Sequence, residues 1–277
     1  MNLENYSSQL FLKDGIYFSK SKSSISYPEK GNDNFFKIED ESFWFNHRNN
    51  IIVEAIKSYS TEKVLFDIGG GNGYVSKAME ESGIEVALVE PGINGCLNAQ
   101  KRKLKTIICS TLEDSEIKKN SIPNIGLFDV VEHIEDDLNF LKNVNNFLKP
   151  GGFVFITVPA FNILWSKEDE DAGHYRRYTI NTIKEVLEHS GLQVNYATYI
   201  FSFLIVPIFL TRTLPSFLGF NKHSNEIKKH KKSHSISTNF IKRIVDFFLK
   251  REVNKIKTRK KIMTGSSVFI IAKKQIK

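Results

Sequence analysis

The sequence predicts an α/β protein with a parallel sheet that helices cover on both faces. Two observations predict this class. From Val64 onward, short apolar runs alternate with helix-like stretches, and the runs are continuously apolar instead of alternating with polar residues. Strands buried on both faces have such runs, and a helix between successive strands makes them parallel. The runs are Val64–Ile68, Val86–Glu90, Thr106–Cys109, Ile125–Phe128 and Phe153–Val158.

Helices are predicted between and beside these strands. Their expected positions are Asn46–Tyr59, Tyr74–Ser82, Asp137–Leu148 and Ile180–Ser190. Pro150, Gly151 and Gly152 end one helix and turn the chain into the strand that follows. A sixth strand is expected in Gly191–Tyr199, and a last strand in Ser267–Ala272.

The pattern divides the chain into three parts. Residues 1–45 are irregular, include the Ser-, Lys- and Pro-containing stretch Ser19–Asp33, and are expected to form an N-terminal cap segment. Residues 46–199 and 265–277 form the core. Residues 200–264 break the rhythm and are predicted to be a helical, basic insertion.

The insertion contains two apolar features on either side of a lysine-rich loop around Lys228–Lys232. Ile200–Leu210 contains Pro207 and is too short to span a membrane, which takes about twenty residues. The second feature is an amphipathic helix near Phe240–Lys257, which is predicted either to lie on a membrane surface or to pack on the protein body. Its apolar stripe is Ile241, Ile244, Val245, Phe248, Leu249, Val253 and Ile256.

The composition of the 277 residues excludes several classes of protein. With 41% hydrophobic and 25% charged residues, the chain is neither disordered nor fibrous. Cys96 and Cys109 cannot form a disulfide framework, no Cys/His spacing suggests a zinc finger, and the start lacks the pattern of a signal peptide, so a cytoplasmic location is expected. Although the net charge is +8, residues 1–220 contain 22 Lys and Arg against 28 Asp and Glu, which argues against nucleic acid as the partner.

A glycine-rich loop directly follows the first strand of the core. Asp67, Gly69, Gly71 and Gly73 occupy alternate positions, and Glu90 ends the next strand. Glycines let a ligand lie against bare backbone, and a carboxylate at that place can accept both hydrogen bonds of a ribose diol. The loop lacks the last glycine of a dinucleotide fingerprint and the Gly-Lys-Ser/Thr of a Walker loop. We therefore expect a nucleoside site of another type.

The Asp67 loop motif, D-x-G-x-G-x-G, resembles the first motif of class I S-adenosylmethionine-dependent methyltransferases. Further segments are similar to the bacterial small-molecule branch of that family (methyltransferase type 11/12-like). They are FWFNHRN (Phe43–Asn49), FDVVEHIEDD (Phe128–Asp137), FLKPGGFVFITVPA (Phe147–Ala160), GHYRRYT (Gly173–Thr179) and GSSVFIIAKK (Gly265–Lys274). Ile122-Pro123 departs from the family pattern, which has Phe-Asp at the start of the fourth strand.

This resemblance implies a Rossmann-like, seven-stranded doubly wound sheet whose last strand is antiparallel. It also implies S-adenosyl-L-methionine as the cofactor. Asp67 and the glycines would border its methionine part, and Glu90 would hold its ribose. The resemblance further places Thr111 and Leu112 beside the adenine and makes Arg48 a candidate for binding the cofactor's carboxylate.

Four further side chains could converge beside the cofactor's methyl group: Asp129, Glu132, His133 and His174. In one interpretation His133 or His174 is a general base. In a second, all four bind a divalent ion such as Mg²⁺ or Mn²⁺, which resembles the arrangement in ubiquinone O-methyltransferases and small-RNA 2′-O-methyltransferases. In a third, Glu132 and His133 only cap and pack the helix after the fourth strand.

Tyr175, Arg176 and Arg177 could clamp an anionic substrate, because guanidinium groups bind phosphate or carboxylate through two hydrogen bonds. The alternative is that an arginine pairs with Asp169 or Glu170 on the protein surface.

The favoured hypothesis is O-methylation of a small molecule, a glycan or a lipid-linked intermediate, with peripheral contact at the inner membrane face in the lipid-linked case. Two rivals stay open: an RNA methyltransferase that uses the basic C-terminal segment, and a noncatalytic binding protein with the same fold.

Overall fold

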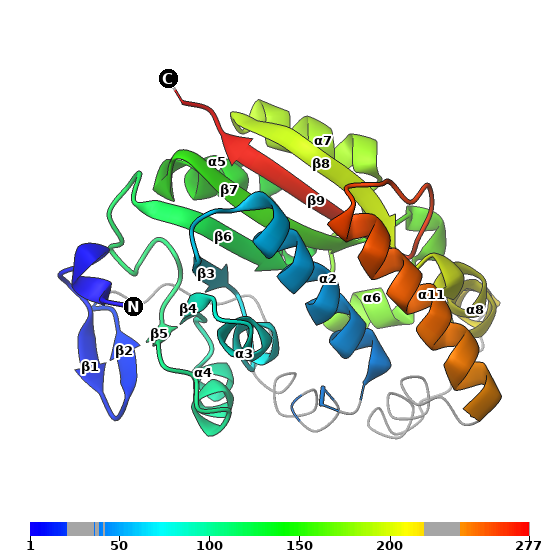
Figure 1. Ribbon diagram of the computed structural model, residues 1–277, viewed down its shortest axis with the longest axis horizontal. Coiled ribbons are helices and arrows are strands. Elements are labelled where there is room, and N and C mark those ends of the chain that lie inside the picture. The colour runs from blue at the N-terminus through cyan, green and yellow to red at the C-terminus, as the bar shows by residue number, and fades with distance from the viewer. Residues whose placement is uncertain (21–35, 37–38, 41, 219–238, 277) are drawn as a thin grey trace.

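The computed structural model describes residues 1–20, 36, 39–40, 42–218 and 239–276, without the side chains of residues 239–244. One sheet runs through the molecule in the order β1-β2-β5-β4-β3-β6-β7-β9-β8, with helices on both of its faces (Figure 1). The expected loop around Lys228–Lys232 and most of Ser19–Asp33 lie outside the described residues.

Seven strands form the predicted core. They are β3 (Val64–Ile68), β4 (Glu85–Val89), β5 (Ile107–Cys109), β6 (Ile122–Phe128), β7 (Leu148–Pro159), β8 (Leu192–Ile200) and β9 (Ser267–Lys274). Across the sheet, the five strands β5, β4, β3, β6 and β7 are each parallel to their neighbours in that order. β9 is antiparallel to both β7 and β8. The expected open sheet with an antiparallel last strand is therefore confirmed. The order of strands reverses between β3 and β6, so the carboxyl ends of these two neighbours border one crevice.

Two strands that the sequence analysis did not predict extend the sheet beyond β5. β1 (Phe11–Lys13) and β2 (Ile16–Phe18) form a hairpin, and β2 pairs with β5 in parallel. Asp14 and Gly15 between them both have positive φ angles, 50° and 80°. An Asp-Gly turn of this type favours a hairpin because its twist matches that of the flanking strands.

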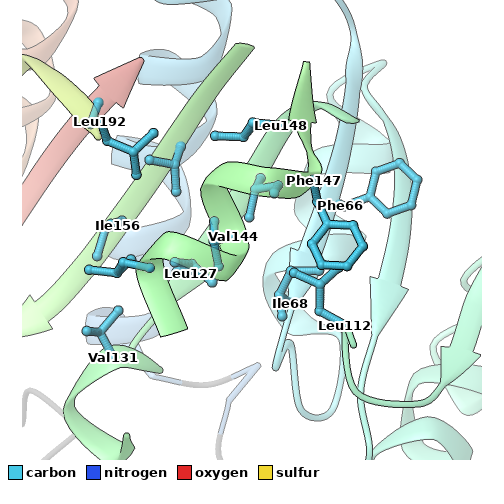
Figure 2. Close-up of a cluster of buried hydrophobic side chains, with 14 of the residues drawn as sticks. Phe66, Ile68, Leu112, Leu127, Val131, Val144, Phe147, Leu148, Ile156 and Leu192 are labelled. Carbon is cyan, nitrogen blue, oxygen red and sulfur yellow. The ribbon is translucent and has the colours of Figure 1, made fainter. Parts of the chain in front are cut away.

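Helices cover the two faces of the sheet and create two main cores. They are α2 (Phe43–Tyr59), α3 (Tyr74–Glu81), α4 (Ile93–Lys101), α5 (Asp137–Phe147), α6 (Lys167–Ala172) and α7 (Ile180–His189). One core joins α5 and α7 to the sheet, and Figure 2 shows it around Phe66, Leu127, Val144 and Ile156. The other core joins α2 and α3 to the opposite face.

The unusual start of β6 has a local compensation. Pro123 has no N–H group for the sheet, and the register with β7 shifts between Ile122 and Asn124. The buried Asn124 side chain donates to the carbonyl oxygens of Glu62 at 2.9 Å and Val64 at 2.8 Å. A side-chain amide thus supplies hydrogen bonds beside the position where the backbone has no donor.

The insertion begins and ends at facing residues, because Ile200 of β8 pairs with Ser267 of β9. Its described helices are η4 (Ser202–Leu204), α8 (Ile205–Ile208), η5 (Phe209–Thr213), α9 (Leu214–Phe217) and α11 (Asn239–Lys257). No helix in the described part of the chain is both long enough and apolar enough to cross a membrane.

The end of α11 packs against the body of the protein beside α2. Ile256 is buried and Val253 half-buried, whereas Phe248 of the same predicted stripe is 41% exposed. The buried Glu252 carboxylate accepts hydrogen bonds from the backbone N–H groups of Phe201 at 2.9 Å and Ser202 at 2.8 Å. The predicted stripe is therefore divided between the protein core and the surface.

Replacing Asn124 by Ala should lower the free energy of unfolding by about 1–3 kcal/mol, because two carbonyl groups lose a donor. Urea denaturation measures this change. Asn146→Ala is the control, since Asn146 is exposed on α5, and it should change stability by less than about 0.5 kcal/mol. Equal losses in the two variants would contradict the compensation by Asn124.

Candidate active site

The glycine loop turns the chain sharply from β3 into α3. Gly69 and Gly73 have φ angles of 68° and 72°, which side chains rarely adopt. A Cβ atom at Gly73 would lie 2.4 Å from Leu104 Cδ1, and one at Gly69 would lie 3.0 Å from Val130 Cγ2. The loop therefore requires glycine at both positions, and it lies directly against the segment that follows β6.

Asp67 lies near the end of β3, under this loop, and is fully buried. Its Oδ2 accepts a hydrogen bond of 2.6 Å from Ser76 Oγ, whereas Oδ1 has no partner among the described residues. Burial raises the pKa of Asp67 to about 6, although the hydrogen bond from Ser76 opposes the rise. Asp67 thus ties the beginning of α3 to the strand.

Glu90 follows β4 and is also buried. Its two carboxylate oxygens accept hydrogen bonds from the backbone N–H groups of Gly71 at 2.9 Å and Gly92 at 2.8 Å. Burial raises the pKa of Glu90 to about 7, although these two hydrogen bonds lower it. Each oxygen has a second lone pair, so Glu90 can still accept hydrogen bonds from a diol.

Thr111 and Leu112 follow β5 and differ in surroundings. Leu112 is 1% exposed and packs in the core, so its side chain does not face a ligand. Thr111 is half-buried, and its hydroxyl oxygen accepts a hydrogen bond of 3.1 Å from the backbone N–H of Asp114.

Arg48 extends from α2 toward the segment after β6. Its guanidinium group forms an ion pair with Asp129 and lies 4.8 Å above the Trp44 ring. The Nε atom of Arg48 is buried without a hydrogen-bond partner among the described residues. The other Asp129 oxygen accepts from Thr157 Oγ1 at 2.9 Å. Both charged side chains are therefore already engaged within the protein.

Three of the four predicted metal ligands converge: Glu132, His133 and His174. One ligand atom of each lies within 4.8 Å of the others, and they are the only such group in the described ranges. Asp129 is not part of this group, and Arg48 and Thr157 hold its carboxylate. The structure thus brings together three of the four residues predicted as metal ligands.

The environment of this cluster is unfavourable to charge. Glu132 is 1% exposed, and its Oε2 has no hydrogen-bond partner among the described residues. Burial, together with the charge of Asp129, raises the pKa of Glu132 well above its usual range. Burial and the neighbouring His174 lower the pKa of His133 to about 4. His133 is therefore neutral at neutral pH, which suits either a base or a metal ligand.

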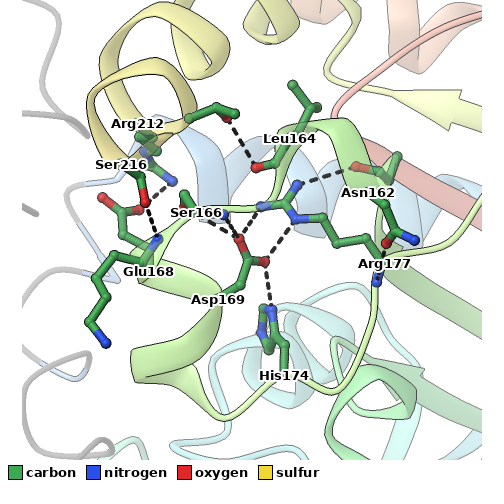
Figure 3. Close-up of polar contacts among 12 residues, drawn as sticks. Asn162, Leu164, Ser166, Glu168, Asp169, His174, Arg177, Arg212 and Ser216 are labelled. Atoms are coloured by element: carbon green, nitrogen blue, oxygen red, sulfur yellow. Dashed lines mark hydrogen bonds and ion pairs between the residues drawn. The ribbon is translucent and has the colours of Figure 1, made fainter. Parts of the chain in front are cut away.

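Asp169 holds both His174 and Arg177 (Figure 3). Its Oδ1 lies 2.9 Å from His174 Nδ1 and 2.8 Å from Arg177 Nε, and its Oδ2 accepts from Arg177 Nη2 at 2.9 Å. Arg177 thus pairs with Asp169, one of the two partners in the alternative interpretation, but the pair is internal and does not lie on the surface.

The other two predicted substrate residues differ from each other. Arg176 pairs with Asp137 at 2.8 Å and donates to the Glu135 carbonyl oxygen at 2.6 Å. The side chain of Tyr175 is exposed, and its backbone N–H donates to the Glu132 carbonyl oxygen at 2.8 Å. The two guanidinium groups therefore have partners inside the protein, and only Tyr175 presents its side chain to solvent.

The sequence predicts Asp169 only as a possible surface partner of an arginine. The run Lys167–Ala172 contains several acidic residues, so composition does not single one out. One signal was present: Ser166 and Asp169 have the spacing of a capping box, and the structure contains that box.

Comparisons with known proteins relate the chain to one family. The profile of a family described as a methyltransferase domain matches residues 46–197. The ubiquinone biosynthesis O-methyltransferase of Vibrio parahaemolyticus is 30% identical over 122 residues, which are 42% of this chain and 52% of that protein. That of Colwellia psychrerythraea is 26% identical over 113 residues, 38% of this chain and 46% of that protein. The chain thus spans about half the length of these curated relatives.

A solved structure shows the same fold at low identity. Phosphoethanolamine N-methyltransferase 2 of Haemonchus contortus, in complex with S-adenosyl-L-methionine, superposes with a TM-score of 0.55 at 21% identity. The match covers 94% of this chain and 62% of that one. Because the family profile spans more than half of the chain, and the predicted motifs and fold agree with it, the chain belongs to the class I S-adenosylmethionine-dependent methyltransferases.

Proposed function

We propose that the chain transfers the methyl group of S-adenosylmethionine to a hydroxyl group of a small molecule. The observation that carries this proposal is the cluster of the buried Glu132 with the half-buried His133 and His174, which has an unpartnered carboxylate oxygen on Glu132. The cluster follows β6, and the neighbouring Val130 touches the glycine loop that follows β3. This position supports a role for the cluster in activating the acceptor beside the proposed cofactor site.

The cofactor would lie across the carboxyl ends of β3, β4 and β5. Glu90 would accept hydrogen bonds from the ribose hydroxyls, and the glycine loop would let the methionine part approach the backbone. Arg48 uses Nη1 for Asp129, so its other N–H groups, which include the unpartnered Nε, would be the donors for the cofactor's carboxylate. Thr111 and the backbone of Leu112 would border the adenine.

Methyl transfer to oxygen is an in-line displacement, so orientation of the acceptor and removal of its proton are the main tasks. A neutral His133 or His174 can take the proton directly. In a metal-assisted reaction, Glu132, His133 and His174 would hold a divalent ion, which would orient the acceptor oxygens and make the hydroxyl more acidic. The mixed oxygen and imidazole set favours Mn²⁺ over Mg²⁺.

The names of the curated relatives support oxygen as the acceptor atom, since both are called ubiquinone biosynthesis O-methyltransferase. The structure adds support for an acceptor linked to a lipid. In the helices of the insertion, Val206, Leu210 and Phe217 are 64%, 54% and 87% exposed. Phe247 of α11 is 61% exposed and is followed by the exposed Lys250 and Arg251. Apolar side chains near basic ones suit an anionic membrane surface.

Glu90→Ala should weaken binding of S-adenosylmethionine about 30- to 150-fold, because loss of two charge-assisted hydrogen bonds costs about 2–3 kcal/mol. Calorimetry measures the affinity. The pKa of Glu90 is raised to about 7, and the ribose hydroxyls donate to the ionised form. Wild-type affinity should therefore decrease about tenfold per pH unit below that pKa, and this step should be absent in the variant.

Glu113→Ala is the matched control for Glu90→Ala, because Glu113 is an exposed carboxylate beside Leu112. It should leave the affinity unchanged. An absence of binding by the well-folded wild type would contradict the proposed function as a whole.

Chelation should abolish turnover in the metal-assisted reaction while leaving cofactor binding intact, and Mn²⁺ should restore turnover. Calorimetric titration with Mn²⁺ gives a second measurement. His174→Ala should weaken Mn²⁺ binding, whereas Asp129→Asn should not, because Arg48 and Thr157 hold Asp129. Full activity in excess chelator would reject the ion and leave His133 or His174 as the base.

The insertion should bind anionic vesicles at low salt and neutral vesicles less well, as co-sedimentation would measure. A variant with Val206, Leu210 and Phe217 all changed to Ser should bind anionic vesicles more than about tenfold more weakly than the wild type. Leu12→Ser is the control, because Leu12 is 59% exposed at the opposite edge of the sheet. Equal binding by both variants would overturn the membrane contact and favour an acceptor that is not lipid-linked.

A further inference from the structure

The backbone around His174 is fixed on both sides of the residue. Gly173 ends α6 with a φ angle of 76°, and the backbone N–H of His174 donates to the Asp169 carbonyl oxygen at 2.9 Å. The next N–H, from Tyr175, donates to the Glu132 carbonyl oxygen at 2.8 Å. These hydrogen bonds therefore fix the backbone of His174 close to Glu132. They do not determine which ring nitrogen of His174 carries the proton.

The Asp169 carboxylate is surrounded by donors (Figure 3). Oδ2 accepts from the backbone N–H of Ser166 at 2.9 Å and from Arg177 Nη2 at 2.9 Å, and Oδ1 accepts from Arg177 Nε at 2.8 Å. The pairing of both oxygens with the guanidinium group of Arg177 is that of a carboxylate, which can only accept hydrogen bonds.

Whenever the His174 ring is neutral, an acceptor at 2.9 Å from Nδ1 determines its tautomer. Nδ1 must carry the hydrogen, which leaves the lone pair on Nε2. The same lone pair is needed whether His174 removes a proton from the acceptor or binds a metal ion. A ring with the opposite tautomer could do neither through Nε2.

A structural role alone does not account for this arrangement. The capping box of α6 uses Oδ2 of Asp169, whereas the bond to the His174 ring uses Oδ1. A buried ion pair with Arg177 is also weak evidence of stabilisation, because desolvation offsets much of the attraction between the charges. The position of Asp169 Oδ1, and its pairing with Arg177, are better explained by a role in holding the His174 ring.

We propose that Asp169 is a positioning residue that fixes the Nδ1–H tautomer and the orientation of His174, and that Arg177 in turn holds Asp169. This inference rests on the proposed function, in which His174 works at the reaction centre. It also gives Arg177 a role other than the substrate clamp expected from the sequence.

Asp169→Asn tests the proposal, because the amide keeps the shape of the carboxylate but can donate to Nδ1. In ¹⁵N-edited NMR at neutral pH, the wild-type His174 ring should carry its hydrogen on Nδ1, and the variant ring should carry it on Nε2. His174→Gln identifies the signal. Transfer of a labelled methyl group from S-adenosylmethionine into fractions of a cell extract identifies a fraction that contains the acceptor. When activity is assayed with this fraction, kcat of Asp169→Asn should be about 10- to 100-fold lower than that of the wild type, while KM for S-adenosylmethionine changes less than about twofold.

Glu170→Gln is the matched control, since Glu170 is an exposed carboxylate on the same helix and pairs with Lys167. It should preserve both the tautomer and kcat. A wild-type His174 with its hydrogen on Nε2 would overturn the proposal even if Asp169→Asn does not fold. Wild-type kcat in a variant with the changed tautomer would overturn it as well. Absence of methyl transfer by the wild type would instead reject the proposed function, and the NMR measurement would still decide the tautomer.

Discussion

A buried carboxylate needs hydrogen-bond donors, and the site depends on how this requirement is met. Backbone N–H groups of the glycine loop and the next turn bind Glu90, the guanidinium group of Arg177 binds Asp169, and that of Arg48 binds the half-buried Asp129. Each pairing fixes a different segment at the carboxyl edge of the sheet. Glu132 and Asp67 are exceptions, because one oxygen of each has no partner among the described residues. Such an oxygen is costly to the fold unless a ligand or a proton satisfies it.

Helix α2 links the site to the insertion through two consecutive residues. Arg48 pairs with Asp129 after β6, whereas the His47 ring lies 3.1 Å from the carboxylate of Glu252 on α11. Phe201, at the start of the insertion, stacks on Trp44 with ring centroids 5.2 Å apart. One helix therefore contacts the proposed reaction centre through one residue and the insertion through its neighbours. Helix α2 is thus held both by the segment that follows β6 and by the insertion.

Much of the fold and part of the site could be predicted from the sequence, because those features are local. The continuous apolar runs and the glycine loop are patterns within short stretches, and they identified the core strands and the place of Glu90. The hairpin of β1 and β2 was missed because its strands have three residues each, too few for a periodic pattern. The engagement of Asp129 by Arg48 could not be predicted, since the two residues are far apart in sequence and meet only when α2 crosses the sheet. For the same reason the sequence did not indicate that Asp129 lies outside the group formed by Glu132, His133 and His174.

The pairing of Ile200 with Ser267 means that the insertion leaves and re-enters the sheet at one place. Two adjacent antiparallel strands need only a short turn between them, so the sheet itself sets no length for the segment that joins β8 to β9. The entropic cost of closing a loop between the two strands rises only slowly with the length of the loop. Evolution could therefore exchange this segment for another without rebuilding the core, and enzymes with the same catalytic edge could acquire different partners by this route.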